Sequence, residues 1–120
     1  MARGSRKASP KASPDGSVLD CLYDVIESRR GEDPESSHSA KLFDRGLDKI
    51  AQKVGEEAVE TVIEATRERR DGVISESADL LYHLLVLWAA SDVKPSDVWS
   101  ALEGRKGISG IVEKASRRSN

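Results

Sequence analysis

An all-α fold, a four-helix bundle-like arrangement completed by dimerisation, is what the sequence predicts. Apolar residues recur at spacings of three and four through most of residues 18–105, which is the period of a helix with one buried face. No segment shows the sustained alternation of apolar and polar residues that a half-buried strand needs. The chain has 120 residues, so we expect one domain, near the lower end of the size that a single core stabilises unaided.

The two ends of the chain differ from its middle in composition. Residues 1–17 combine Ser, Pro, Gly and basic residues with almost nothing to bury, so they predict a disordered basic extension. The domain is then expected over residues 18–118. After the last helix, residues 108–120 predict a short helical or frayed tail.

The first helix is expected to begin at Val18, where apolar residues start to recur at helical spacing, and to run to Arg30. Gly31 supplies a stop signal. Residues 31–37 contain an Asp-Pro breaker and predict a loop, and its last serines can cap a second helical segment that starts near Ser39.

Residues 41–70 predict one long amphipathic helix with a continuous apolar stripe, which Gly46 and Gly55 are able to bend. Val59 and Ile63 fall outside that stripe, nearly opposite it at 100° per residue. A second buried face is therefore expected, as in a bundle completed by a partner subunit.

The next connection is expected at Asp71-Gly72, a dipeptide typical of turns. Residues 73–90 then predict a helix that is apolar on most sides and therefore central to the core. Pro95 fits the first turn of a last helix, which is expected to stop at about residues 104–107.

Charge and cysteine content restrict the class of protein. The net charge is −2, but residues 1–17 carry four basic groups against one acidic group, which leaves −5 on the remainder. An acidic domain argues against nucleic acid as a partner. Cys21 is the only cysteine and no apolar signal segment follows the amino terminus, which indicates a cytoplasmic protein. The apolar run Leu80–Ala90 is too short for a membrane span, so no membrane association is expected.

Acidic residues gather on the two central predicted helices. Glu57, Glu60 and Glu64 share one face of the long helix with Lys53, beside its apolar stripe. On the following helix, spacings of three and four relate the acidic and titratable residues Glu76, Asp79 and His83. If these helices form an antiparallel hairpin, the pairs Glu57-x-x-Glu60 and Glu76-x-x-Asp79 converge. The ordinary alternative is a solvated acidic surface.

Four adjacent carboxylates without a cation would repel one another and take up protons. Mg²⁺ resolves that conflict, because it prefers carboxylate, water and phosphate oxygens. We therefore assign the metal to Glu57, Glu60, Glu76 and Asp79, and we place His83 behind them, bonded to Asp79. The chain has no phosphate-binding loop, no dinucleotide glycine fingerprint and no Cys/His spacing suited to zinc.

Several segments together resemble the phosphoribosyl-ATP pyrophosphohydrolase family: SHSAKLF from Ser37, GLDKI from Gly46, KVGEEAVETVIEA from Lys53, ESADLLYHLLVLW from Glu76 and SGIVEKASR from Ser109. The resemblance covers roughly residues 18–118. It includes EExxE followed by ExxD, the hallmark of the all-α nucleoside triphosphate pyrophosphohydrolases. One departure is that family members often carry Ser-Tyr-Thr where this chain has Ser37-His38-Ser39, which puts an aromatic contact in doubt.

The resemblance implies a Mg²⁺-dependent homodimer that hydrolyses phosphoribosyl-ATP to phosphoribosyl-AMP and pyrophosphate, the second step of histidine biosynthesis. Glu57 and Glu60 are expected to act in catalysis through the metal, and Glu56 to orient the water or serve as base. The expected substrate-binding residues are basic: Lys41, Lys49, Lys53 and Arg105.

Other functions remain open at this point. A housecleaning pyrophosphohydrolase for (deoxy)nucleoside triphosphates would use the same carboxylates. A non-catalytic helical interaction module is the alternative from another class. A carboxylate-bridged iron bundle is disfavoured, because its Glu-x-x-His pairs occur here only at Glu35 and His38, in the predicted loop.

Overall fold

The computed structural model describes residues 13–107, and every regular element within that range is a helix. In chain order the helices are α1 (Ser17–Ser28), α2 (His38–Arg45), α3 (Leu47–Thr66), α4 (Arg70–Ala90) and α5 (Pro95–Arg105). The all-α prediction is confirmed for this part of the chain. Most of the expected extension and the whole of the expected tail lie outside the described residues.

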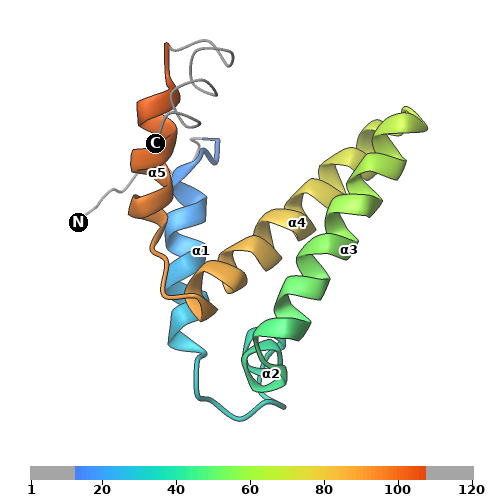
Figure 1. Cartoon of the computed structure of the whole chain (residues 1–120). Coiled ribbons are helices and arrows are strands. Elements are labelled where there is room, and N and C mark those ends of the chain that lie inside the picture. Colours follow the sequence, from blue (N-terminus) through green and yellow to red (C-terminus); the bar gives the residue numbers. More distant parts are fainter. Residues whose placement is uncertain (1–12, 108–120) are drawn as a thin grey trace.

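The helices are arranged around α4 (Figure 1). α3 and α4 lie side by side as a long hairpin, α2 packs at its open end, and α1 packs against the C-terminal half of α4. α5 lies along α1 on the side away from α3, and its Trp99 ring meets the ring of Trp88 on α4 edge-on, with centroids 5.8 Å apart. One chain therefore supplies a two-helix hairpin with helices gathered at one end, and the described residues do not close into a four-helix bundle by themselves.

The segment predicted as one helix over 41–70 is two helices, and that prediction was wrong at Gly46. Gly46 has φ +97° and ψ 173°, a conformation that residues with a Cβ rarely adopt, so the backbone turns there. α2 begins at His38, one residue earlier than expected, because the Ser37 side chain accepts a hydrogen bond from the Ala40 backbone N–H at 3.0 Å. α3 then continues through Gly55 without interruption.

The turn predicted at Asp71-Gly72 is also misplaced, since both residues lie in the first turn of α4. The chain reverses at residues 67–69 instead, where Glu68 adopts φ +55°. Gly72 serves another purpose: a Cβ built there would lie 2.7 Å from Cδ of Glu64 on α3. The absence of a Cβ at Gly72 leaves room for the Glu64 side chain beside α4 near the connection.

The core lies at the end of the hairpin where α1, α2, α3 and α4 meet. Its largest fully buried side chains are Ile26, Ile50, Leu85 and Val86. Two of these four come from α4, so the expectation that this helix is central to the core is confirmed. Removing one of them would be expected to cost about 2–5 kcal/mol of stability.

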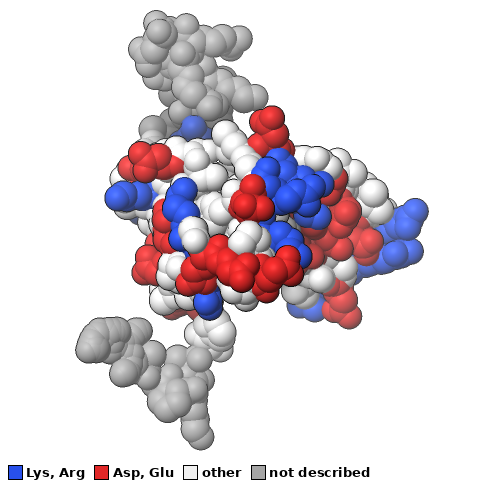
Figure 2. All heavy atoms as spheres, turned by 90° about the horizontal axis from the view of Figure 1, so that it is seen from below, with Lys and Arg blue, Asp and Glu red and all other residues white. Residues whose placement is uncertain are grey.

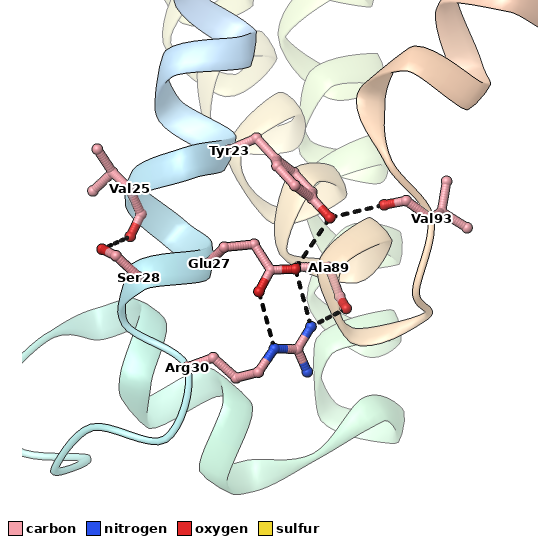
Figure 3. Close-up of polar contacts among 7 residues, drawn as sticks. All are labelled: Tyr23, Val25, Glu27, Ser28, Arg30, Ala89 and Val93. Carbon is pink, nitrogen blue, oxygen red and sulfur yellow. Dashed lines mark hydrogen bonds and ion pairs between the residues drawn. The ribbon is translucent and has the colours of Figure 1, made fainter.

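Polar contacts fasten α1 to the end of α4 (Figure 3). Tyr23 donates its hydroxyl proton to the Val93 carbonyl at 3.0 Å, and Arg30 donates to the Ala89 carbonyl and to Glu27. The Arg30 guanidinium also lies 4.9 Å from the centre of the Phe43 ring, which extends the contact to α2. Arg30 thus adds a side-chain donor to the Ala89 carbonyl at the C-terminal end of α4, and Tyr23 holds the connection that follows the helix at Val93.

Both helices of the hairpin carry exposed apolar side chains. On α3, Val59, Val62 and Ile63 are 58%, 59% and 39% exposed, and on α4 Ile74 and Leu81 are 54% and 42% exposed. Side chains three and four residues apart share one side of a helix, so the α3 residues form one stripe. The face predicted from Val59 and Ile63 to be buried is therefore uncovered in a single chain.

By length and composition alone, α4, with 21 residues, is long and apolar enough to cross a membrane. The sequence expectation of no span considered only the shorter apolar run from Leu80. Core helices of soluble proteins pass the same test, and here α4 packs against α1, α2 and α3. The feature therefore carries little weight for a membrane location.

Candidate metal and substrate site

The antiparallel course of α3 and α4 brings three predicted carboxylates together. Glu57 from α3 meets Glu76 and Asp79 from α4, and one oxygen from each lies within 4.8 Å of the others. The three-residue spacing of Glu76 and Asp79 puts both on one side of α4, and the short connection at 67–69 sets which turn of α3 faces them. These oxygens are close enough to share one cation.

Two of these side chains, Glu57 and Glu76, each have a buried oxygen without a hydrogen bond from the described residues. Glu57 is 7% exposed, and its Oε1 and the Oε1 of Glu76 are buried without a hydrogen-bond partner among the described residues. Burial, followed by the neighbouring carboxylates Glu57 and Glu60, raises the pKa of Glu76 to about 7. A buried carboxylate with no donor is costly, and a divalent cation with oxygen preference fits these residues.

Glu60 and Glu64 occupy different places around that group. Glu60 is exposed one turn along α3 from Glu57, outside the set of three, yet it is near enough to raise the pKa of Glu76. Glu64 is half-buried further toward the connection, where it packs at Gly72 and lies 3.7 Å from Arg69 Nη1. Glu60 therefore borders the carboxylate group, whereas Glu64 supports the helix connection.

Glu56 points elsewhere. Its side chain is exposed and accepts a hydrogen bond from Gln52 Nε2 at 2.7 Å, with Lys53 Nζ at 3.4 Å. The Gln52 bond, followed by Lys53, lowers the pKa of Glu56. A carboxylate held in its ionised form by such partners is a weaker base than a free one.

The four basic residues predicted to bind substrate lie at three places in the structure. Lys53 Nζ lies 3.8 Å from Glu57 Oε2, and both Lys53 and Lys41 are near enough to His38 to lower its pKa. Lys49 is near Glu56 and contributes to lowering its pKa. Arg105 belongs to the C-terminal end of α5, a helix that lies along α1 on the side away from α3, so one chain does not bring it to the carboxylates (Figure 1).

His83 lies directly behind Asp79, though through a different atom from the one expected. Its Nδ1 is 2.8 Å from the backbone carbonyl of Asp79, and the ring is buried. The second ring nitrogen of His83 has a partner that was not predicted from the sequence: Nε2 lies 3.3 Å from Nε2 of His38 on α2. The sequence did indicate that His38 lies at the start of a helix capped by a serine, but this does not reveal which helix packs against it.

An aromatic contact is present at Ser37-His38-Ser39, where the sequence differs from the Ser-Tyr-Thr of many family members. The His38 ring stacks on Tyr82 with centroids 5.7 Å apart, and the Tyr82 hydroxyl bonds the Ser39 hydroxyl. The start of α2 is thereby tied to the same part of α4 that carries Asp79.

Charge at this end of the molecule is mixed. Figure 2, a view from below, shows Asp and Glu side chains interspersed with Lys and Arg over the face in sight. Such a surface suits a small charged ligand held at a local site better than an extended polyanion.

A family model described as phosphoribosyl-ATP pyrophosphohydrolase matches residues 19–106. The chain belongs to the phosphoribosyl-ATP pyrophosphohydrolase family. Every carboxylate and basic residue predicted for the site lies within the range that this family model matches.

Relatives in this family are similar over most of their length. The chain is 61% identical to the phosphoribosyl-ATP pyrophosphatase of Azospirillum brasilense over 102 residues, covering 85% of this chain and 92% of the relative. It is 59% identical to that of Gluconobacter oxydans over 100 residues, 83% of this chain and 75% of the relative. With the protein of that name from Rhodospirillum rubrum it shares 52% identity over 110 residues, 92% of each chain.

Proposed function

We propose that this protein hydrolyses phosphoribosyl-ATP to phosphoribosyl-AMP and pyrophosphate in a Mg²⁺-dependent reaction, the second step of histidine biosynthesis. One observation carries the proposal: Glu57, Glu76 and Asp79 meet around a common point, and two of their oxygens are buried without a donor. Family membership and relatives named for this activity support the choice of substrate. As a biosynthetic enzyme it would work in the cytoplasm.

Glu57, Glu76 and Asp79 are the residues that would hold Mg²⁺, with Glu60 at the border of the group completing the set. When bound, the ion supplies neutralisation of triphosphate charge and activation of water. Lys53, beside Glu57, and Lys41 of α2 would bind phosphate oxygens, which is supported by the effect of both charges on His38. Lys49 and Arg105 stay candidates for more distant phosphate contacts.

Glu60 is better placed than Glu56 to orient the attacking water. It is exposed at the edge of the carboxylate group, whereas Glu56 is bonded to Gln52 and Lys53. Proton transfer to such a carboxylate needs only hydrogen-bond reach.

We also propose that the functional unit is a homodimer. The exposed apolar face of the hairpin would be covered by the same face of a second copy, giving the four-helix arrangement that one chain lacks. The position of Arg105 relative to the carboxylates of the second copy would then depend on how the two copies pack.

The test is product analysis with the purified protein, phosphoribosyl-ATP, and Mg²⁺ either present or chelated. We expect equimolar phosphoribosyl-AMP and pyrophosphate only with the metal. A parallel panel with dCTP and dUTP separates the alternative of a housecleaning enzyme, which would prefer those substrates. Absence of pyrophosphate from every nucleotide would support a non-catalytic module and contradict the proposal.

A further inference from the structure

A chain of hydrogen bonds joins the start of α2 to the backbone of Asp79. His38 Nε2 lies 3.3 Å from His83 Nε2, and His83 Nδ1 lies 2.8 Å from the Asp79 carbonyl oxygen. His83 is buried at 6% exposure, whereas His38 is exposed. The chain therefore runs from a carboxylate-bearing turn of α4 out to an accessible ring.

The chemistry of the partners sets the order of donors. A carbonyl oxygen only accepts, so Nδ1 of His83 carries the proton and donates it to Asp79. A neutral His83 then has an unprotonated Nε2, which accepts. His38 must consequently donate from its own Nε2, and when it is neutral its Nδ1 has a free lone pair.

The surroundings keep His38 in that state. Burial against its neighbours, followed by His83, Lys53 and Lys41, lowers the pKa of His38, so the neutral ring is favoured. Stacking on Tyr82 holds the plane of the ring. Nδ1 has no hydrogen-bond partner among the residues that the structure describes.

We propose that His38 is a substrate-positioning residue whose Nδ1 accepts a hydrogen bond from a ribose hydroxyl of the phosphoribosyl nucleotide. The inference rests on the proposed function, since it specifies how the sugar is held at that site. An acceptor within the electrostatic reach of Lys53 and Lys41 suits a phosphorylated sugar, because lysines donate to phosphate oxygens whereas a hydroxyl proton needs an acceptor.

Two variants distinguish this role from a structural one. In His38→Asn the side-chain amide lies at the position of Nδ1, so an acceptor is retained and the bond to His83 is lost. In His38→Gln the amide lies at the position of Nε2, so the bond to His83 is retained and the outward acceptor is lost. A merely structural role predicts that Gln is the better replacement, whereas sugar recognition predicts that Asn is.

The measurement is the affinity of the Mg²⁺-loaded protein for phosphoribosyl-AMP and, separately, for pyrophosphate, by titration calorimetry. We expect His38→Gln to bind phosphoribosyl-AMP roughly threefold to tenfold more weakly than His38→Asn, the range of one neutral hydrogen bond. Pyrophosphate affinity should be equal in both variants and in the wild type.

Each other outcome counts against the role of His38. Equal affinities of the two variants for phosphoribosyl-AMP, or a better His38→Gln, would overturn it even if the wild type hydrolyses phosphoribosyl-ATP. Wild-type protein that neither hydrolyses phosphoribosyl-ATP nor binds its product would overturn the proposed function as well. Turnover by the wild type therefore tests the function, and the ranking of the variants tests His38.

Discussion

The side chain of Glu57 combines burial with negative charge. It is 7% exposed, its Oε1 has no donor among residues 13–107, and the carboxylates of Glu76 and Asp79 face it from α4. Lys53 lies 3.8 Å from its other oxygen and balances part of that charge. In the proposed Mg²⁺ site, an ion between the helices would remove the remaining repulsion between these carboxylates.

Replacement of Glu57 by Gln should abolish turnover without unfolding the protein. We expect phosphoribosyl-ATP hydrolysis to fall by at least about a hundredfold, because one oxygen ligand and its charge are lost. The helical circular dichroism should stay near wild type, since Gln has the same shape and carries no charge to desolvate. Glu103→Gln, an exposed change on α5, is the control and should leave turnover unchanged. Normal turnover in Glu57→Gln would discard the assignment of the metal ligands.

The raised pKa of Glu76 predicts that the stability of the metal-free protein depends on pH. Burial, with Glu57 and Glu60, raises its pKa from the ordinary 4.5 to about 7 in the folded protein, so between these values the folded state binds more protons than the unfolded state. The stabilising contribution is therefore complete below the unfolded pKa and is lost as the pH rises through the folded pKa. In Glu76→Gln this loss should be absent.

The measurement is the Tm of chelator-treated wild type and Glu76→Gln between about pH 5 and about pH 8. We expect the wild type to lose stability relative to the variant as the pH rises, and Glu103→Gln to run parallel to the wild type. A constant difference between wild type and Glu76→Gln across this range would show that the Glu76 carboxyl titrates as it does in the unfolded chain.

At the scale of the elements, glycines distinguish a break from a continuous helix. Gly46 separates α2 from α3 in a conformation that is nearly exclusive to glycine, whereas Gly55 has helical geometry inside α3 and nothing within 4 Å of a built Cβ. The sequence alone treated both as possible bends. Their φ angles depend on whether tertiary packing requires a change of direction, and α2 turns to pack on α4.

Two alanine substitutions should therefore have opposite effects on stability. Gly46→Ala is expected to lower the free energy of unfolding by about 1–3 kcal/mol, the cost of a strained backbone. Gly55→Ala is expected to raise it by about 0.5–1 kcal/mol, because alanine loses less backbone entropy in a helix. Urea unfolding of both variants measures the two changes side by side. Similar effects of the two changes would contradict the conformations given to these residues.

For the whole molecule, the main unpartnered feature is the apolar face of the hairpin. Val59, Val62 and Ile63 on α3 are exposed in one chain, and burying such side chains in a second copy would contribute about 1.5–3 kcal/mol each. A small domain gains more from such burial than a large one, because its own core is limited.

We expect the wild type to sediment as a dimer and Val59→Glu with Ile63→Glu to sediment as a monomer, since two charges would be buried in the interface. Val25→Glu, at a 47% exposed position on α1, is the matched control and should remain dimeric. Analytical ultracentrifugation over a range of concentrations measures the change. A monomeric wild type would contradict the dimer. A dimer that withstands the double change would place the interface on another surface.

Sequence by itself determined the helical class, the apolar character of α4 and the acidic residues at helical spacing, because these follow from local periodicity. It also supplied Pro95 as the start of α5, because proline fits the first turn of a helix whatever surrounds it. The position of the α3–α4 connection was missed, because Asp71-Gly72 has the composition of a turn while its glycine serves the close approach of Glu64.

Only the tertiary structure decided which acidic residues meet. Helical spacing places Glu57, Glu60 and Glu64 on one face, but the register between α3 and α4 selects Glu57 to face Glu76 and Asp79. The same packing pairs His38 with His83 across 45 residues of sequence. Such pairs depend on how two helices are rotated and shifted against each other, and no periodicity within either helix contains that information.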